Sequence, residues 1–454
     1  MERLGGEHEG NTSSVKQVAL ASLVGTTIEW YDYFIYGTTA ALVFNQLFFP
    51  AFSPLAGTLA AFATFAVGFF ARPLGGVIFG HYGDKLGRKT MLVVTLLLMG
   101  VATFLIGLLP SFETIGIWAP ILLVVLRIVQ GLGLGGEWGG AALMVSEHSP
   151  PNRRGFYASS VQMGAAGGLI ISAAVITAVS QLMTEAQFAA WGWRIPFLAS
   201  IVLIAVGTFI RFQIAESEAF TRLKEAGAEA QMPIVEVFRT RPKNVLLAAG
   251  TSGANNVVFY TVSVFTVSYG VSQLGQSQGT MLTYQLLVAL VYFFTIPLFG
   301  ALSDRIGRRA MIIAGIITMA LFSFPYFWLV DTGSGPVILL AMVLALSVFQ
   351  AAAYAPQSAF IPELFDTRVR YSGAALGYNL ATMIFGGTAP FIATALFAWA
   401  GQSTWAISIY VVAICLVSFV SVYLATETPM LREGSDQTDE RRLTASRSEE
   451  TAGS

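Results

Sequence analysis

Two carboxyl groups and two phenols share one face of the first apolar segment of the chain. This segment is largely apolar, but it includes Glu29, Asp32, Tyr33 and Tyr36 at offsets 0, 3, 4 and 7. On an α-helix this spacing places the four side chains together. A carboxyl group held there can take up and release a proton, whereas phenols can hydrogen-bond a polar solute. Tyr33 and Tyr36 are therefore candidate substrate ligands.

The fourth apolar segment carries the opposite charge in the same manner. It places Arg127, Gln130 and Glu137 at offsets 0, 3 and 10. We therefore expect Asp32 or Glu29 to meet Arg127 across a central cavity. The candidates for proton coupling are Asp32, Glu29 and Glu137, and those for substrate binding include Arg127 and Gln130. The alternative is a static buried ion pair that only fixes the packing of the helices.

Two further arginines lie in or beside apolar segments. Arg72 precedes Pro73 in the second segment, where it either binds an anionic substrate or pairs with a carboxylate of another helix. Arg194 ends the sequence Trp-Gly-Trp-Arg, and both residue types favour the interface between membrane and water. Arg72 is therefore kept as a candidate substrate ligand, whereas Arg194 is expected at the membrane surface.

The second half of the chain offers amides and phenols in place of charges. No ionised residue lies deep in its seventh, eighth, eleventh or twelfth apolar segment. Such groups can hydrogen-bond a substrate, although any single amide can equally serve as packing glue between helices. The candidates for substrate binding are Asn255, Asn256, Tyr260, Gln357 and Asn379.

The composition requires a membrane as the solvent. Apolar residues make up 55% of the 454 residues and charged residues only 11%, whereas a soluble domain carries about 25% charge. Apolar runs of about 20 residues span a bilayer as helices. Twelve such runs occur, at 18–48, 55–80, 90–109, 117–146, 156–181, 194–212, 245–271, 281–302, 310–330, 337–361, 372–398 and 404–425. We predict an all-α membrane protein with twelve transmembrane helices in two pseudo-symmetric six-helix bundles.

Basic residues alternate between the connections of these helices. Clusters such as Lys85, Arg88 and Lys89 occupy every second connection, and the other connections contain no Lys or Arg. By the positive-inside rule, both termini are cytoplasmic. We expect a bacterial inner membrane, action as a monomer, and a linker that is either a surface helix or solvated. The expected divisions are a tail (1–17), an N-terminal bundle (18–214), the linker (215–244), a C-terminal bundle (245–426) and a disordered tail (427–454).

Two sequence patterns at the cytoplasmic side occur once in each half. Gly80–Lys89 and Gly300–Arg309 keep Gly, Asp, a basic residue, Gly and two basic residues at the same offsets. A second pattern spaces a glutamate and an arginine seven residues apart. Topogenic charge alone would not require the repeated acids, so we expect a gate. The expected acid–base pairs within each half are Asp84 with Arg88, Asp304 with Arg308, Glu147 with Arg154, and Glu363 with Arg370.

These repeated loops resemble the signature of the major facilitator superfamily. Within it, the chain resembles the metabolite:proton symporters, and Gln187-Phe188 and Arg370-Tyr-Ser-Gly373 are most similar to the shikimate carriers. The resemblance implies the major facilitator fold and proton-coupled uptake by alternating access. The motifs that carry it are Glu-Trp-Tyr-Asp (29–32), Ala-Arg-Pro-Leu-Gly-Gly (71–76), Gly-Gly-Glu-Trp-Gly-Gly (135–140) and Trp-Gly-Trp-Arg-Ile-Pro-Phe (191–197).

Other classes of function lack support in the sequence. The glycine-rich run 131–136 has no preceding strand, so close helix packing explains it better than a dinucleotide site. We expect no enzymatic activity, because no nucleophile–base pair or metal-ligand cluster is present. One cysteine, Cys415, and three separate histidines offer no disulfide, metal site or cofactor site.

The expected function is import of a small organic acid, shikimate-like or another carboxylate, together with at least one proton. Asp32, seconded by Glu29, would load the proton, and Arg127 would hold the carboxylate. The alternatives are a symporter of a compatible solute such as proline or betaine, or of a di- or tricarboxylate. Trp30 and the tyrosines of the first segment keep the compatible-solute alternative open, because aromatic rings bind quaternary ammonium groups.

Overall fold

The structure is a computed structural model of the chain. It describes residues 15–86, 88–135, 137–213, 237, 239–365 and 370–425. Residues 1–14 of the predicted N-terminal tail, the predicted C-terminal tail and most of the predicted linker lie outside the described residues, whereas residues 15–17 belong to the first helix. All regular elements in the described part are helices, so the predicted all-α class is confirmed.

Within the described residues, the first half of the chain forms six helical segments, and several of them are interrupted by a break or a π-helical turn. In chain order they are α1 (Val15–Thr39) with the π-turn Ala40–Phe44 and α2 (Asn45–Phe48); α3 (Pro54–Leu86); α4 (Arg88–Leu108); α6 (Trp118–Gly133) with α7 (Glu137–His148); α8 (Arg154–Leu182); and α9 (Glu185–Gln187) with the π-turn Phe188–Gly192 and α10 (Arg194–Gln213). The short α5 (Phe112–Ile115) connects the third and fourth segments.

The described residues of the second half repeat this organisation with six further segments. They are α13 (Pro242–Tyr260) with the π-turn Thr261–Phe265 and α14 (Thr266–Ser272); α15 (Gln278–Ile306); α16 (Arg308–Val330); α17 (Gly335–Met342) with the π-helix Val343–Gln350, α18 (Ala351–Tyr354) and α19 (Gln357–Phe360); α20 (Arg370–Ala381) with the π-turn Thr382–Gly386 and α21 (Ala389–Trp399); and α22 (Trp405–Leu424).

Most of these segments are long and apolar enough to cross a membrane. Among the described residues eight pass that test, and a pair bent by 49° at Trp193 makes a ninth. The segments of α1, α4 and α13 fall short for local reasons. α1 carries Glu29 and Asp32, α13 carries two adjacent asparagines, and the apolar part of α4 covers only Val93–Leu108.

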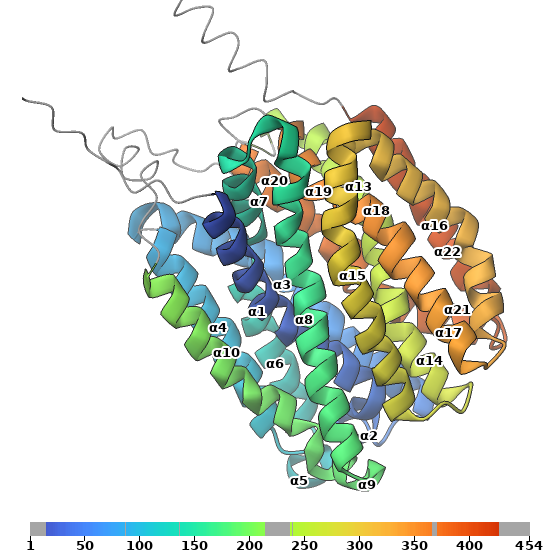
Figure 1. Cartoon of the computed structure of the whole chain (residues 1–454). Coiled ribbons are helices and arrows are strands. Elements are labelled where there is room, and N and C mark those ends of the chain that lie inside the picture. Colours follow the sequence, from blue (N-terminus) through green and yellow to red (C-terminus); the bar gives the residue numbers. More distant parts are fainter. Residues whose placement is uncertain are drawn as a thin grey trace, which may run out of the picture.

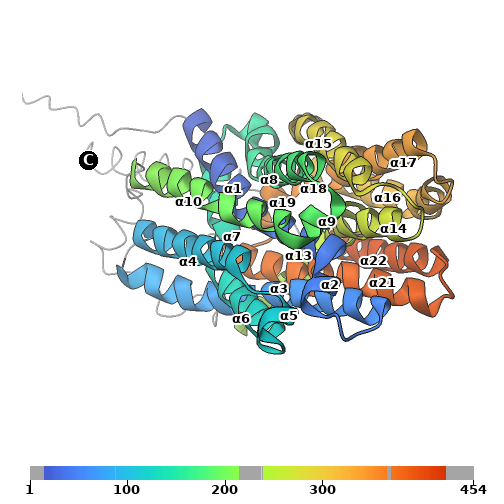
Figure 2. The ribbon, with the colours of Figure 1, turned by 90° about the horizontal axis from the view of Figure 1, so that it is seen from below.

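The two halves lie side by side, with α8 and α15 packed against each other where they meet (Figures 1 and 2). Across the same interface α3 packs on α20 and α21. The fifth segment thus meets the eighth and the second meets the eleventh, as two-fold pseudo-symmetry requires. We call the end where α8 and α16 begin the basic end, because Arg154, Arg308 and Arg370 lie there. The other end, near α5 and α9, is the opposite end.

The glycine-rich run between α6 and α7 has the predicted packing role. A Cβ added at Gly131 would lie 2.0 Å from the carbonyl oxygen of Gly68, and one added at Gly135 would lie 2.0 Å from the amide nitrogen of Gly76. Only glycine therefore allows the fourth segment to approach α3 so closely. Within this run α6 ends at Gly133, and α7 begins at Glu137.

Candidate functional site

A small pocket lies between the two halves. The space open to the centre of a water molecule is about 10 Å³, so in this conformation it holds about one water. Because both halves line the pocket, movement of one half against the other would open or close it. The first half contributes Trp30 and Ala165, and the second contributes Asn255, Asn256, Phe259, Tyr260, Gln350, Tyr354 and Tyr378.

The wall of this pocket consists mainly of aromatic rings and amides. Both amide atoms of Asn255 and the hydroxyl of Tyr260 are buried without a hydrogen-bond partner among the described residues. Buried polar groups are nearly always paired, so these atoms are the ones that a bound solute would satisfy. Asn256 instead donates to the carbonyl oxygen of Ser252 at 2.9 Å. The pocket thus contains three of the predicted substrate residues.

Two other predicted substrate residues lie outside the pocket wall. Gln357 donates to the carbonyl oxygen of Thr251 at 3.1 Å and accepts from the hydroxyl of Ser252 at 3.2 Å, which ties α19 to α13. Asn379 donates to the carbonyl oxygen of Gly135 at 2.5 Å, across the two halves. The contacts of Gln357 are those of packing glue, the alternative considered from the sequence.

Glu29 and Arg72 form a buried ion pair between α1 and α3. Arg72 Nη2 lies 3.2 Å from Glu29 Oε1, and the two side chains are 1% and 2% exposed. The guanidinium carbon of Arg72 also lies 5.6 Å from the ring centroid of Tyr33 and 5.8 Å from that of Phe69. The sequence leaves Arg72 two roles, binding an anionic substrate or pairing with a carboxylate of another helix. In the structure Arg72 pairs with such a carboxylate, that of Glu29.

Arg127 is connected to Asp32 through two neutral side chains. Arg127 Nη1 donates to Gln130 Oε1, and Gln130 Nε2 donates to Thr103 Oγ1 at 2.7 Å. Thr103 Oγ1 in turn donates to Asp32 Oδ2 at 2.8 Å. The second guanidinium nitrogen of Arg127 donates to the carbonyl oxygen of Phe65 at 3.0 Å. We call Arg127, Gln130, Thr103 and Asp32 the buried relay; all four are at most 2% exposed.

The expectation of direct contact between Arg127 and Asp32 or Glu29 is wrong. Arg127 has no described carboxylate within 4.0 Å, and all three residues belong to the first half rather than facing one another across the central cavity. The reason is local. The guanidinium is seated against Gly68, where an added Cβ would lie 2.6 Å from Nη2, and Gln130 occupies the space toward Asp32.

The two predicted tyrosines surround this arginine. The guanidinium carbon of Arg127 lies 3.9 Å from the ring centroid of Tyr36 and 4.9 Å from that of Tyr33. Tyr36 shares a hydrogen bond of 2.6 Å with Thr64, whereas the hydroxyl of Tyr33 has no partner among the described residues. Both rings therefore stabilise the buried cation through their π faces.

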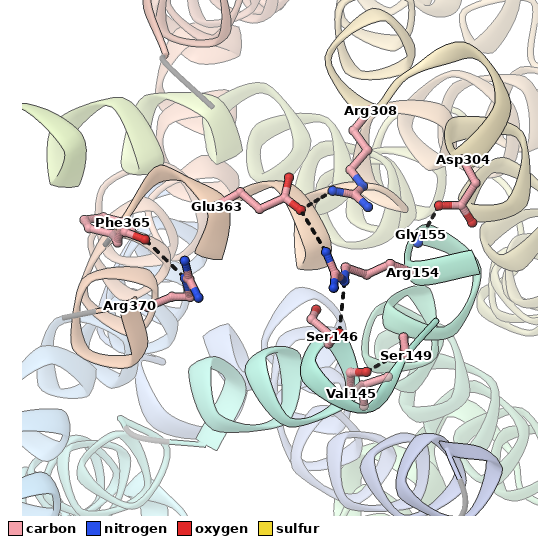
Figure 3. Close-up of polar contacts among 10 residues, drawn as sticks. All are labelled: Val145, Ser146, Ser149, Arg154, Gly155, Asp304, Arg308, Glu363, Phe365 and Arg370. Atoms are coloured by element: carbon pink, nitrogen blue, oxygen red, sulfur yellow. Dashed lines mark hydrogen bonds and ion pairs between the residues drawn. The ribbon is translucent and has the colours of Figure 1, made fainter. Parts of the chain in front are cut away.

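At the basic end, charged groups join the two halves (Figure 3). The carboxylate of Asp304 accepts from the backbone N–H of Gly155 at 2.7 Å and from that of Phe156 at 2.9 Å. Glu363 pairs with Arg308 of its own half and lies 3.9 Å from Arg154 Nη1 of the other half. Two acids of the second half thus contact the start of α8. Asp304 accepts from its first N–H groups, and Glu363 lies near its first residue, Arg154.

The expected pairing within each half is therefore wrong for Asp304 and Arg308. The first N–H groups of a helix have no partner inside the helix, and Asp304 lies where α8 exposes them. The side chain of Glu147, the expected partner of Arg154, lies outside the described ones, as do those of Asp84, Arg88 and Glu137. Arg370 donates to the carbonyl oxygen of Phe365 at 3.1 Å.

Aromatic contacts between the halves close the pocket on its two sides. Toward the basic end, the rings of Trp138 and Tyr378 stack with centroids 3.8 Å apart. Toward the opposite end, Phe69 packs on Tyr260 at 5.6 Å and Phe34 on Phe259 at 5.4 Å. Rings of the two halves therefore contact each other on both sides of the pocket.

Reasoning from the sequence missed Thr103 and Trp138. Thr103 is one of two threonines within the apolar part of α4, the other being Thr95, and nothing in its sequence neighbours distinguishes it from a packing residue. Trp138 stands in Gly-Gly-Glu-Trp-Gly-Gly (135–140), a motif that enters the sequence analysis only as part of the family resemblance. A large ring among glycines that allow close helix approach was the available signal.

Comparison with known proteins agrees with this architecture. A family profile described as Major Facilitator Superfamily matches residues 23–387 and, in a second match, residues 276–449. The shikimate transporter of Escherichia coli K12 is 43% identical over 92% of this chain and 95% of its own. A glycine betaine/proline/ectoine/pipecolic acid transporter of Dickeya dadantii is 34% identical over 91% of this chain and 84% of its own.

Solved structures give the same fold. The crystal structure of a D-xylose-proton symporter superposes with a TM-score of 0.70 at 19% identity, over 92% of this chain and 99% of the other. The predicted fold of twelve helices in two bundles is therefore confirmed. The chain belongs to the Major Facilitator Superfamily and is a membrane transporter of that family.

Proposed function

We propose that this transporter imports a small organic acid, shikimate-like or another carboxylate, together with at least one proton. The observation that carries the proposal is the buried relay, which links a cation to a carboxylate inside the first half. Arg127 has no described carboxylate at ion-pairing distance, so it can hold an anionic solute. Asp32 can carry the proton, because an ionisable group inside a membrane is costly unless it serves function.

The pocket supports a solute that also carries hydroxyl groups. Asn255 and Tyr260 offer donors and acceptors that no described residue uses, and the hydroxyl of Tyr33 is likewise unpartnered. Neither Arg72 nor Arg127 lines the pocket in this conformation. We propose that the substrate carboxylate reaches Arg127 when the halves move apart. The relative named as a shikimate transporter, 43% identical, supports this class of substrate.

A compatible solute such as proline or betaine is the second candidate. The described wall of the pocket carries aromatic rings, including Trp30, Phe259 and Tyr378, and no charged side chain. Such a wall suits a quaternary ammonium group, which binds to aromatic faces. The Dickeya relative named for betaine and proline supports this alternative at 34% identity. A di- or tricarboxylate would need more cationic groups than this wall supplies.

We propose that the pocket opens to the two ends alternately, because different kinds of contact hold the halves together at each end. The basic end is held by Asp304 on α8 and by Glu363 near Arg154, and the opposite end by aromatic rings. Breaking one set while keeping the other would expose the pocket to one side. We propose that the predicted gate residues Asp84, Arg88, Glu147 and Arg370 act with these contacts.

The setting of the transporter is proposed from its charge pattern. Basic residues gather at one end, which we place in the cytoplasm together with both termini. We propose that the membrane is the inner membrane of a bacterium and that the functional unit is the monomer, because both halves of one chain line the pocket. The bundles 18–214 and 245–426 are proposed as the moving bodies.

Uptake by reconstituted vesicles tests the proposal. Radiolabelled shikimate, citrate, 2-oxoglutarate, proline and glycine betaine are offered with an inward pH gradient, a membrane potential, or neither. One proton with a monoanion moves no net charge, so the pH gradient should drive accumulation and the potential should not. Accumulation of an acid that ignores the imposed pH gradient would remove proton coupling. Selective uptake of betaine would favour the second candidate.

A further inference from the structure

We propose that Thr103 is a positioning residue for proton coupling, and that its hydroxyl reverses its hydrogen bond when Asp32 takes up a proton. The proposal rests on the proposed function, since it assigns a residue to the coupling step. Thr103 lies on α4, whereas the coupling residues expected from the sequence lie on the first and fourth segments.

The surroundings of Thr103 place three groups around one hydroxyl. The side chain is fully buried. Its Oγ1 lies 2.8 Å from Asp32 Oδ2 and accepts from Gln130 Nε2 at 2.7 Å. The carbonyl oxygen of Met99, one turn earlier on the same helix, lies 3.0 Å from the same Oγ1. Both Asp32 and Met99 can accept the single hydroxyl hydrogen.

A hydroxyl has one hydrogen to donate and two lone pairs to accept with. While Asp32 is ionised, Thr103 donates to the carboxylate and accepts from Gln130. Once Asp32 is protonated, its own O–H can donate to Thr103, whose hydrogen turns to the carbonyl of Met99. Both states satisfy the hydrogen bonds of Thr103 with the heavy atoms where they are. A buried group that stays satisfied in both states avoids the cost of an unpaired polar atom.

The same hydroxyl connects the proton to Arg127. In the ionised state every donor of the buried relay points from Arg127 toward Asp32, and bonds in such a chain polarise one another. Once Asp32 is protonated, the common donor direction stops at Thr103, whose hydroxyl then accepts from both Gln130 and Asp32. The pull of the carboxylate on the guanidinium weakens, and Arg127 becomes available to a substrate carboxylate. Thr103 thereby couples proton loading to substrate binding.

Other ionisable groups near Asp32 are few among the described side chains. Glu29, Tyr31, Tyr33 and Tyr36 share its helix, and Arg127 comes from α6. From α3, Arg72 is engaged by Glu29. Among the described side chains, the elements packed most closely on α1 carry their ionisable groups near their ends: Arg154 and Tyr157 on α8, Arg194 on α10, and His148 on α7.

Packing alone does not account for these contacts. A buried threonine in a helix commonly bonds the carbonyl four residues earlier, and the contact to Met99 is of that kind. Thr39 on α1 is such a residue, since its hydroxyl donates to the carbonyl of Ile35 at 2.6 Å. Thr103 in addition bonds side chains of two other helices. Thr39→Val is therefore a matched control for Thr103→Val.

The test compares Thr103→Val, Thr103→Ser and Thr39→Val with wild type in reconstituted vesicles. Radiolabelled shikimate is the probe, and both uphill uptake and exchange at equal pH are measured. Thr103→Val should lose at least tenfold in accumulation ratio while keeping exchange within about threefold. The pH at half-maximal uptake should rise by about one unit, because the ionised carboxylate loses a hydrogen bond. Thr103→Ser and Thr39→Val should behave as wild type.

A double variant guards against a mere folding defect. If Thr103 acts through Asp32, adding Thr103→Val to Asp32→Asn should leave exchange as it is in Asp32→Asn alone. Wild-type accumulation and pH profile in Thr103→Val would overturn the inference and leave the proposed function standing. A further loss of exchange in the double variant would also overturn it. Wild-type protein that ignores the pH gradient would overturn both proposals.

Discussion

The indole of Trp138 and the phenol ring of Tyr378 stack face to face across the two halves of the transporter. Their centroids are 3.8 Å apart and their planes differ by 7°. The indole N–H of Trp138 donates to Gln162 Oε1 at 3.1 Å, and Gln162 Nε2 donates to the carbonyl oxygen of Tyr354 at 3.2 Å. Tyr378 itself lines the pocket. The stack therefore separates the pocket from the basic end.

Removing this stack should open the pocket toward the basic end. Stacked aromatic pairs contribute about 0.5–1.5 kcal/mol beyond the burial of their area, so Trp138→Ala should favour the open state severalfold. The readout is alkylation of Asn256→Cys in a Cys415→Ser background, with reagent added from the basic end. Trp138→Phe, which keeps a ring, should label nearly as slowly as the parent.

A lipid-facing tryptophan provides the control for this experiment. Trp118 is 62% exposed on the surface of the bundle, so Trp118→Ala should not change the labelling rate. Equal labelling of Trp138→Ala and the parent would show that the stack does not close the pocket.

Asp304 should hold α8 of the other half in place through its charge. A carboxylate at a helix N-terminus contributes about 0.5–2 kcal/mol, and here it accepts from two N–H groups. Asp304→Ala should therefore increase opening at the basic end by about tenfold and slow net uptake. Asp304→Asn, which keeps one acceptor, should fall between. The same cysteine-labelling assay measures both variants.

The control for Asp304→Ala is the removal of a neighbouring charge that takes no part in the contact between Asp304 and the N–H groups of α8. Arg305, one residue along the chain, has no ion pair among the described residues, so Arg305→Gln should label like the parent. If Asp304→Ala and Arg305→Gln gave the same labelling, a contribution from the charged cap would be excluded.

Asp32→Asn should separate exchange from accumulation. An amide accepts a hydrogen bond from Thr103 but cannot carry the proton, so exchange should persist while uphill uptake falls to the level without a gradient. Wild-type uptake should fall as the external pH rises, since fewer protons are available to load Asp32. The variant should lose this dependence. Normal uphill uptake by Asp32→Asn would move the coupling site elsewhere, with Glu137 as the next candidate.

The sequence predicted the helices better than the contacts between them. Apolar length locates a membrane helix, and the side chains singled out on α1, Glu29, Asp32, Tyr33 and Tyr36, are buried along with their neighbours. Periodicity within one helix does not reveal which neighbour each side chain meets. Glu29 pairs with Arg72, and Asp32 accepts a hydrogen bond from Thr103, whereas the sequence predicts that one of these two carboxylates contacts Arg127.

At the basic end, too, the repeated sequence patterns predicted which residues act together but not which groups they contact. Repetition indicated that Asp304, Arg308 and Glu363 belong to a common device, but spacing along the chain favoured partners within each half. The actual partners of Asp304 are backbone N–H groups of the other half. Backbone groups leave no mark in the sequence, and so only the packed structure could reveal this cap.

A double-mutant cycle should decide whether Glu29 and Arg72 form a static pair. Removing one member of a buried ion pair leaves an isolated charge and costs about 3–5 kcal/mol, whereas removing both can be nearly neutral. Glu29→Gln and Arg72→Gln should therefore each lower the melting temperature, measured in detergent, more than the double variant does. If the pair only fixes packing, the double variant should also exchange shikimate at close to the wild-type rate. A stable double variant that binds no substrate would instead assign Arg72 to the substrate, because the guanidinium would then be needed beyond its role in pairing Glu29.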